Sequence, residues 1–385
     1  MSLRSNRFPC RPCCAYPNMT VFLRMILSPL TAMGSVMNGT IYDDCTRPLF
    51  AFDSVGDAAP GEKAEPAPHR RANSGAIPNV VVISNPRSHR NKTRGLEVPE
   101  GVRIEEPKTR PELRRLLAEL VRDGLDLVIV AGGDGTVRDV LTCGAEIWAG
   151  SEPVIGVLPC GKTNALAIDL GVPDDATVAD LIASWRAGST IDRSPIEIEL
   201  AGEGTPVLGF LFGGGAFVDA TELAQTTHRW GAVNNLAVGM SVFGGVFSTF
   251  FGGARSPWRQ GKQMAIRYGK GARPRHGATL DSEAARFLFL ASTMERLPLD
   301  AAVFGERRAG LKTLVVDAPP RRFLRNFVRI MRGVDVPALE RDGIHRVDAE
   351  EVRVMLEGGF VLDGERFPAG DYLLRQGAPI RFATA

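Results

Sequence analysis

The sequence has no large excess of charge of either sign and no cysteine pattern typical of a metal site. Its 385 residues carry a formal net charge of +2 at pH 7, so the overall charge gives no indication of a nucleic-acid binder. None of the six cysteines has the spacing that a four-ligand zinc site needs, and we expect ordinary reduced thiols. The length leaves room for about two domains.

Acidic residues are absent from the first 42 residues, which contain several arginines and a modestly apolar segment at 19–37. Residues 54–76 are rich in alanine, proline, glycine and charge, a composition typical of disordered linkers. We therefore predict that residues 1–76 are a disordered leader and linker. A targeting peptide and a mis-assigned start are the alternative interpretations.

No internal repeat of fixed period is present, and the chain divides instead into two kinds of pattern. In the first, strands are predicted at 79–84, 126–131 and 153–159, and helices at 109–124, 136–150 and 163–171. Because strands and helices alternate with short connections, we predict a parallel α/β domain over residues 77–190.

In the second pattern, short runs of alternating apolar and polar residues are bounded by glycine or proline. This pattern predicts a mostly antiparallel β domain over residues 191–385, whose last residues could return to the first domain. The charge-free residues 232–254 are long enough to cross a bilayer, but their glycines and asparagines make them a poor span. We expect a helical excursion there, with contact to a lipid surface as the alternative.

The most distinctive motif follows the second predicted strand and reads Gly132, Gly133, Asp134, Gly135, Thr136. Glycines at a strand-to-helix turn leave backbone N–H groups open to an anion such as a nucleotide phosphate. Asp134 would repel a bare phosphate, so its presence indicates a Mg²⁺ ion or a hydroxyl between the two. A tight turn in which Asp134 caps the helix is the alternative.

The next predicted strand ends in a similar way, with Gly161, Lys162, Thr163 and Asn164 at the start of the following helix. The first strand delivers Asn85 to the same edge of the predicted sheet. Carboxyl ends of adjacent parallel strands face one crevice, which is where α/β proteins bind their ligands. We therefore predict that these residues share one nucleotide site.

With these motifs in this order, the sequence resembles the diacylglycerol kinase catalytic domain family, which includes bacterial lipid kinases and sphingosine kinases. The resemblance rests on ISNPRS, GGDGTVRDVL, GVLPCGKTNALA and VLDGERF, and it extends from residue 78 to the C-terminus. GGDGT alone is shared with NAD kinases, whereas the late Asp-Gly-Glu sequence is the distinguishing feature. The sequence departs from the usual pattern of this family at two places: the bulky HRNK sequence follows NPRS, and Lys162 lies between Gly161 and Thr163.

The resemblance implies an α/β ATP-binding domain like those of NAD kinases and phosphofructokinases, followed by an antiparallel β-sandwich domain for an acceptor lipid. It implies transfer of the γ-phosphoryl group of ATP to a lipid hydroxyl, such as that of diacylglycerol or a sphingoid lipid, with Mg²⁺. Asp134 and Glu365 are the implied catalytic residues, and Asp134 is also the candidate metal ligand. The implied nucleotide-binding residues are Asn85, Gly132, Gly133, Gly135, Thr136, Gly161, Thr163 and Asn164, with Lys162, Asp219 and Asp363 as weaker site candidates.

Two other functions stay open. One is an NAD kinase-like enzyme with a soluble acceptor, and the other is a nucleotide-binding regulator with little or no turnover, which the two departures would suit. For a lipid kinase we expect a cytoplasmic protein that contacts the membrane surface transiently and has a lipid substrate as its partner. We expect no nucleic-acid partner and leave the oligomeric state open, with a dimer as one option.

Overall fold

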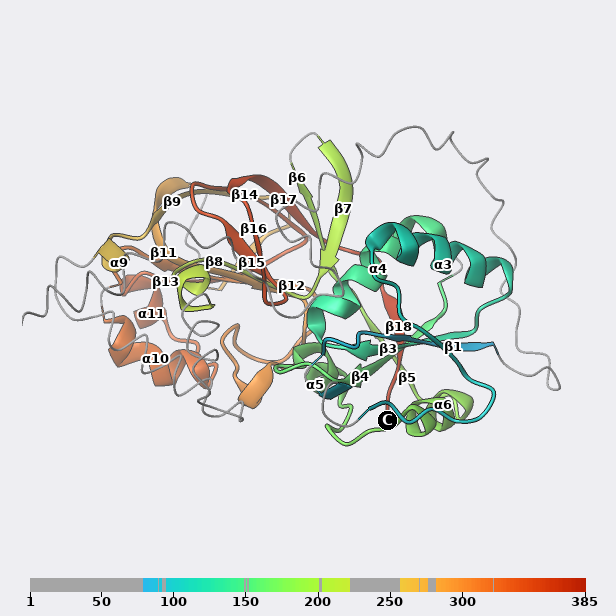
Figure 1. The fold of residues 1–385 in the computed structure, drawn as a ribbon. Helices are drawn as coiled ribbons and strands as arrows, with labels where there is room; N and C mark the ends of the chain where they lie inside the picture. Colours follow the sequence, from blue (N-terminus) through green and yellow to red (C-terminus); the bar gives the residue numbers. More distant parts are fainter. Residues whose placement is uncertain are drawn as a thin grey trace, which may run out of the picture. The chain divides into compact units, whose positions relative to one another are not determined.

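The computed structural model describes residues 79–88, 90–91, 95–148, 150, 152–200, 203–221, 257–269, 271–275, 282–320 and 322–385 (Figure 1). The predicted leader at 1–76 and the charge-free stretch at 232–254 lie outside these residues. The described chain contains one parallel-dominated sheet with helices on both faces and one larger antiparallel sheet. This architecture confirms the fold class that the sequence predicts.

The first sheet has six strands in the order β2-β1-β3-β4-β18-β5. The strands are β1 (Val80–Ser84), β2 (Arg103–Glu105), β3 (Leu127–Gly132), β4 (Val154–Pro159), β5 (Thr190–Arg193) and β18 (Ile380–Ala383). Strands β1, β2, β3 and β4 pair in parallel, and β18 lies parallel to β4 and antiparallel to β5. The last strand of the chain therefore completes the sheet that the first strands begin.

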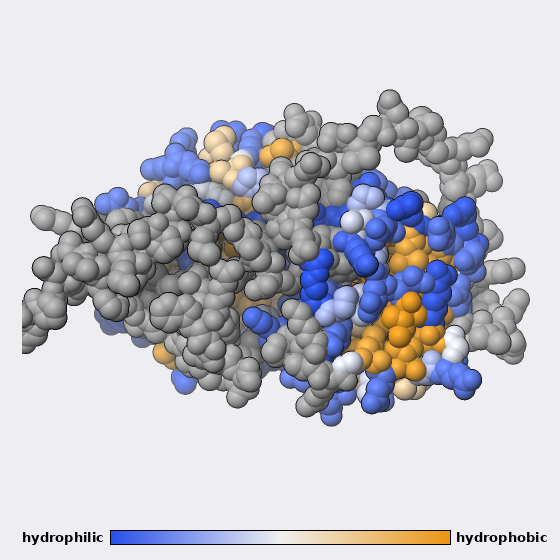
Figure 2. All heavy atoms as spheres, in the orientation of Figure 1, coloured by the Kyte–Doolittle hydropathy of each residue, from blue (hydrophilic) through white to orange (hydrophobic). Residues whose placement is uncertain are grey.

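Helices α3 (Arg110–Arg122) and α4 (Asp134–Trp148) cover one face of this sheet, and α5 (Ala165–Leu170) and α6 (Val178–Arg186) cover the other (Figure 1). Helix α3 begins where the sequence indicates, because the Thr109 hydroxyl accepts a hydrogen bond from the N–H of Glu112. Strands β1 and β3 are buried along their whole length, as expected of parallel strands covered on both faces. The space-filling view shows apolar side chains gathered over this α/β part of the chain (Figure 2).

The second sheet has 12 strands, and every pairing within it is antiparallel. Its strands are β6 (Ile196–Leu200), β7 (Glu203–Gly209), β8 (Leu211–Gly215), β9 (Lys262–Tyr268), β10 (Arg273–Pro274), β11 (Ser282–Ser292), β12 (Leu311–Asp317), β13 (Ile344–Ala349), β14 (Glu351–Leu356), β15 (Phe360–Leu362), β16 (Glu365–Phe367) and β17 (Gly370–Gln376). Strand β8 pairs with both β11 and β15, so it attaches the short β15–β16 hairpin to the sheet at β11. The inner core of this part is aromatic, with Phe360 stacked between Phe212 and Phe367.

Helices α9 (Pro257–Gln260), α10 (Phe323–Met331) and α11 (Pro337–Arg341) also accompany the second sheet. Phe323 and Ile330 of α10 and Leu339 of α11 are buried in one cluster with Leu314 of β12 and Ile344 of β13. The sequence patterns predict none of these three helices. Among the residues that the structure describes, no helix combines the length and the apolarity that crossing a bilayer requires.

Candidate active site

The turn from β3 to α4 is so short that only Gly133 separates the strand from the helix. A Cβ atom on Gly132 would lie 2.5 Å from the Cβ of Thr136, a distance that no side chain tolerates. Thr136 is fully buried, and its hydroxyl accepts a 2.9 Å hydrogen bond from the side-chain amide of Asn85. Glycine is therefore required where β3 passes the first turn of α4.

The two predicted phosphate turns pack directly against each other. A Cβ atom on Gly161 would lie 2.6 Å from the Cα of Gly133, and one on Gly133 would lie 3.2 Å from the Cα of Gly161. The N–H of Cys160 also donates to the carbonyl of Gly132 at 3.0 Å. The ends of β3 and β4 are thus joined backbone to backbone, as the adjacent strand ends indicate.

This packing predicts a selective effect of added methyl groups. Gly161→Ala should force the two turns apart, lower the free energy of unfolding by about 1–3 kcal/mol and disturb the predicted nucleotide site. Gly358→Ala is the matched control, because its Cβ would approach no atom closer than 3.7 Å. Thermal shift with and without ATP measures both effects, and equal behaviour of the two variants would contradict the tight packing.

Asp134 is the first residue of α4, but its carboxylate caps a different helix. Its two oxygens accept hydrogen bonds of 3.0 Å from the N–H groups of Ala165 and Leu166, at the start of α5. Burial raises the pKa of the Asp134 carboxyl above its usual value, although these N–H groups act in the opposite direction. Asp134 therefore links the β3–α4 turn to α5 through a partly desolvated carboxylate.

Asn164 precedes α5 in the left-handed conformation, with φ of 49°. Its side-chain oxygen accepts a 2.8 Å hydrogen bond from the N–H of Gly161, and its amide donates back to the carbonyl of Gly161 at 3.2 Å. Asn164 thus closes the second glycine turn on itself. Lys162 and Thr163, between these two residues, are exposed.

Asn85 follows β1 and is completely buried. Besides its bond to Thr136, its side-chain oxygen accepts a 3.0 Å hydrogen bond from the N–H of Arg87. Asn85 therefore fixes the loop after β1 to the first turn of α4, and its predicted role at a nucleotide stays a prediction. Gly135 is buried within α4, and Asp219 is half-buried in the helical residues 216–221 that follow β8.

Asp134, Arg138 and Thr142 are four residues apart in succession and so share one face of α4. The buried Thr142 hydroxyl accepts a 3.1 Å hydrogen bond from the N–H of Leu208 in β7. Arg138, also buried, donates to the carbonyl of Leu362 at 3.2 Å. This face of α4 therefore contacts the antiparallel sheet.

Arg138 joins the early glycine-rich motif to the late Asp-Gly-Glu motif. Its guanidinium forms ion pairs with Glu365 and with Asp139, the latter at 3.1 Å, and lies 5.6 Å from the centre of the Phe367 ring. Arg138 and Asp139 are fully buried, and Glu365 is only 6% exposed. The ion pair therefore joins Glu365 to Arg138, the residue one helical turn after Asp134 on α4.

The β15–β16 hairpin turns at Asp363 and Gly364, both of which have positive φ, 48° and 83°. Two such residues in a two-residue loop are typical of the type I′ hairpin turn. The Asp363 carboxylate accepts hydrogen bonds from the N–H groups of Phe210 at 3.1 Å and Leu211 at 2.9 Å, both to the same oxygen. The Asp-Gly-Glu sequence is therefore both a hairpin turn and a connection to the start of β8.

Burial raises the pKa of Asp363 to about 7, and the negative charge of Asp134 is the second cause. The carboxylates of Asp134 and Asp363 are thus close enough to repel each other. Mg²⁺ is usually held by one or two carboxylates together with phosphate oxygens. In the ligand-free protein, the oxygens of both acids accept backbone N–H groups. Within the described part of the chain no group of three or more acidic, histidine or cysteine side chains could hold an ion, so phosphate oxygens would have to complete the coordination.

The raised pKa of Asp363 predicts a pH-dependent stability of the ligand-free protein. The folded state keeps this proton to about pH 7, whereas the unfolded chain loses it near the ordinary value of 3.8. The folded state therefore binds more protons between these limits, and stability falls as pH rises through them, by at most about 4 kcal/mol.

Melting temperatures across this pH interval test the prediction. Asp363→Asn should flatten the fall, because the asparagine oxygen can still accept both N–H bonds while the charge is absent. Identical pH slopes for the variant and the wild type would contradict the assignment.

Residues Gly156 to Thr163 also match the letters GxxxxGK[ST] of a Walker A loop. In such a loop, the phosphate-binding backbone lies between the strand and the helix. Here Gly156 lies inside β4, opposite Ile129 of β3, and Lys162 is exposed. The match is therefore confined to the sequence, and the turn between β4 and α5 does not have the geometry of a Walker A loop.

The fold is similar to those of solved structures. A crystal structure titled as a diacylglycerol kinase from Bacillus anthracis str. Sterne aligns with a TM-score of 0.52 and 18% identity over 80% of this chain and 97% of that chain. A second structure from the same organism gives a TM-score of 0.56 with the same identity and coverage. At this identity the likeness concerns the fold, an α/β domain combined with an antiparallel β domain.

Sequence comparisons match part of the chain. Residues 79–192 match the model of the diacylglycerol kinase catalytic domain family. Among curated relatives, "Probable lipid kinase YegS" of Salmonella heidelberg is 36% identical over 99 residues, which are 25% of this chain and 33% of that protein. "Probable lipid kinase YegS-like" of Cronobacter sakazakii is 36% identical over 78 residues, which are 20% of this chain and 26% of that protein.

These matches span about a quarter to a third of the length of the curated relatives. Arg138 is the residue of this site that the sequence motifs do not single out. Its position four residues after Asp134 was the available signal, because that spacing places both on one helix face.

Proposed function

We propose that the protein is an ATP-dependent kinase that transfers the γ-phosphoryl group to the hydroxyl of a lipid such as diacylglycerol or a sphingoid lipid. The observation that carries the proposal is the connection from Asp134 through Arg138 to Glu365. It joins a glycine-lined turn, suited to a phosphate donor, to a hairpin of the antiparallel sheet. Phosphoryl transfer needs a donor site, a metal and an acceptor-orienting group held together.

On the donor side, the N–H groups at the start of α4 and around Gly161 would hold the phosphates of ATP. Asp134 and Asp363 would hold Mg²⁺ when it is bound, and that ion would neutralise charge on the transferred phosphoryl group. Thr163 and Lys162 are exposed at the second turn and could reach a triphosphate. Asn85 and Thr136 would keep the loop after β1 and the first turn of α4 in register.

On the acceptor side, the lipid hydroxyl must lose its proton as its oxygen attacks the γ-phosphorus and the bond from phosphorus to the leaving ADP oxygen breaks. Asp134 and Glu365 are the two candidate carboxylates for that proton. Arg138 would hold Glu365 in place and keep the hairpin against α4. In this proposal the site acts at the surface of a membrane from the cytoplasmic side.

The deciding experiment is mass spectrometry of the products after incubating the purified full chain with ATP, Mg²⁺ and total membrane lipid. We expect a phosphorylated lipid whose formation depends on both ATP and Mg²⁺. Phosphorylation of NAD or another soluble alcohol instead of a lipid would overturn the lipid assignment. No product from any acceptor would overturn the kinase assignment.

A regulator that binds a nucleotide without turnover is the second candidate. The observation that favours it is that the carboxylates of Asp134 and Glu365 both have partners within the protein. This candidate predicts that ATP raises the melting temperature while no lipid is phosphorylated. The product analysis above separates it from the kinase.

A further inference from the structure

Helix α10 has an unusual charge pattern for a helix on a sheet. No acidic residue lies between Asp317 and Asp335, and the interval contains five arginines. Four of them, Arg322, Arg325, Arg329 and Arg332, are exposed and recur at intervals of three or four residues. They therefore form one stripe along the outer side of α10.

An apolar side chain interrupts this stripe. Val328 is 55% exposed and lies between Arg325 and Arg329. Val334, just after the helix, and Leu299 are also exposed, at 36% and 47%. Leu299 belongs to the segment whose Ala302 donates to the carbonyl of Met331 at the end of α10.

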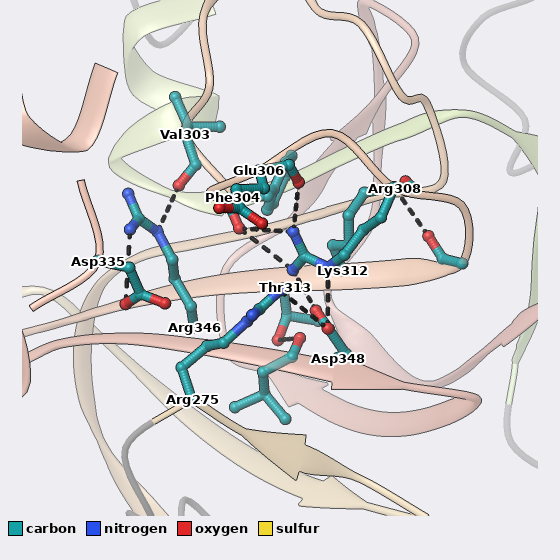
Figure 3. Close-up of polar contacts among 12 residues, drawn as sticks. Arg275, Val303, Phe304, Glu306, Arg308, Lys312, Thr313, Asp335, Arg346 and Asp348 are labelled. Atoms are coloured by element: carbon teal, nitrogen blue, oxygen red, sulfur yellow. Dashed lines mark hydrogen bonds and ion pairs between the residues drawn. The ribbon is translucent and has the colours of Figure 1, made fainter. Parts of the chain in front are cut away.

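The inner side of α10 is fixed to the second sheet. Arg346 of β13, only 3% exposed, donates to the carbonyls of Ile330 at 3.2 Å and Val334 at 2.7 Å, and to that of Val303 at 2.8 Å. Figure 3 shows its guanidinium between Val303 and Asp335. A buried cation on the last carbonyls of a helix satisfies groups that would otherwise lack partners.

The other end of α10 is anchored by the buried Asn326, whose amide donates to Asp342 at 2.8 Å. Of the acidic residues around the helix, Asp342 pairs with Arg322 at 3.0 Å and Asp335 pairs with Arg346 at 3.9 Å. Within the residues that the structure describes, no carboxylate forms an ion pair with the other three arginines of the stripe. Arg329 donates to the side-chain oxygen of Asn326 at 3.3 Å, a neutral partner, and Arg325 helps to lower the pKa of Asp342 without pairing with it. The stripe therefore keeps positive charge that no ion pair neutralises.

We propose that the outer face of α10 docks on an anionic lipid surface. A basic helix face with exposed apolar side chains binds at the membrane interface, where its arginines meet lipid headgroups and its apolar groups enter the acyl boundary. Val328 within the stripe favours lipid over nucleic acid, which offers phosphates but no apolar layer. The proposal extends the proposed lipid kinase activity, because a membrane acceptor would be reached from such a surface.

The test is co-sedimentation of the full chain with vesicles of phosphatidylglycerol and phosphatidylcholine in equal parts, against phosphatidylcholine alone, without ATP. The triple variant Arg325→Gln, Arg329→Gln, Arg332→Gln should lose about 100-fold in affinity for the anionic vesicles, at about fivefold per arginine. The control is Arg115→Gln, Arg122→Gln, Arg186→Gln, which removes the same charge from exposed helix positions of the α/β domain. It should lose only a few-fold, and Val328→Ser alone should weaken the binding that persists in high salt.

Three outcomes would overturn the proposal: no preference for anionic vesicles, equal losses in the two triple variants, or α10-dependent binding of duplex DNA in place of vesicles. Melting temperatures verify that each variant folds. Activity on a dispersed short-chain acceptor separates this inference from the proposed function, because the α10 variant should retain that activity. A protein that binds vesicles through α10 but phosphorylates no lipid would leave this inference standing and refute the kinase.

Discussion

Arg138→Met is expected to lower the free energy of unfolding by about 3–5 kcal/mol and to abolish any phosphoryl transfer. The substitution leaves Glu365 and Asp139 buried without the cation between them, although Arg110 still contacts Asp139 at 3.3 Å. It also removes the hydrogen bond to the carbonyl of Leu362. Urea unfolding monitored by tryptophan fluorescence measures the loss.

The matched control is Arg353→Met, which breaks the ion pair with Asp371 on the surface of the second sheet. Exposed pairs of this kind contribute less than about 1 kcal/mol. The double variant Arg138→Met, Glu365→Gln should recover part of the loss, because it removes one of the two stranded charges. If Arg138→Met and Arg353→Met lowered the free energy of unfolding equally, or if the double variant recovered none of that stability, the buried pair would not hold the hairpin to α4.

Asp134→Asn is expected to lower kcat by about 10³ or more while the protein stays folded. Asparagine keeps one acceptor for the N–H groups at the start of α5 but carries no negative charge for Mg²⁺ or for a proton. The lost hydrogen bond and the relieved burial of a carboxylate oppose each other, so stability should change by no more than about 1 kcal/mol. Steady-state kinetics on the lipid found by product analysis measures kcat, and thermal unfolding measures stability.

Asp180→Asn is the control for Asp134, because Asp180 also accepts a backbone N–H bond at a helix start but is exposed on α6. It should leave turnover unchanged. Magnesium-dependent binding of ATP provides a second readout, which Asp134→Asn should weaken. An Asp134→Asn protein with normal turnover would remove Asp134 from both of its proposed roles.

Three strands and three helices of the α/β domain could be predicted from the sequence, because their signals are local, whereas β2 was not predicted and most of β5 was assigned to the second domain. The buried strands β1, β3 and β4 are continuous apolar runs, and α3 begins at a threonine cap followed by proline. Helix α4 begins at Asp134, two residues before the predicted start at residue 136. Helix α6 was not predicted, although Thr177 and Asp180 form a capping box that marks its start.

The second half was predicted less completely for a physical reason. Antiparallel strands have local alternation, but their order depends on contacts between distant residues. Helix α10 also escaped prediction, because its buried residues Phe323, Asn326 and Ile330 include a polar one, whose partners are Asp342 and Arg329. The sequence also does not show which side of α10 is exposed. The arginines form a surface stripe because the opposite side of the helix packs against the sheet.

By itself, the sequence determined the chemistry available at the site: the glycine turns, two aspartates and one glutamate in the order of a kinase family. Only the tertiary structure decided that Asp134 caps α5, that Gly133 meets Gly161, and that Arg138 pairs with Glu365. Residue types and helix starts depend on near neighbours in the chain. A buried ion pair between residues 138 and 365 depends on how the sheets pack, and no local pattern encodes that packing.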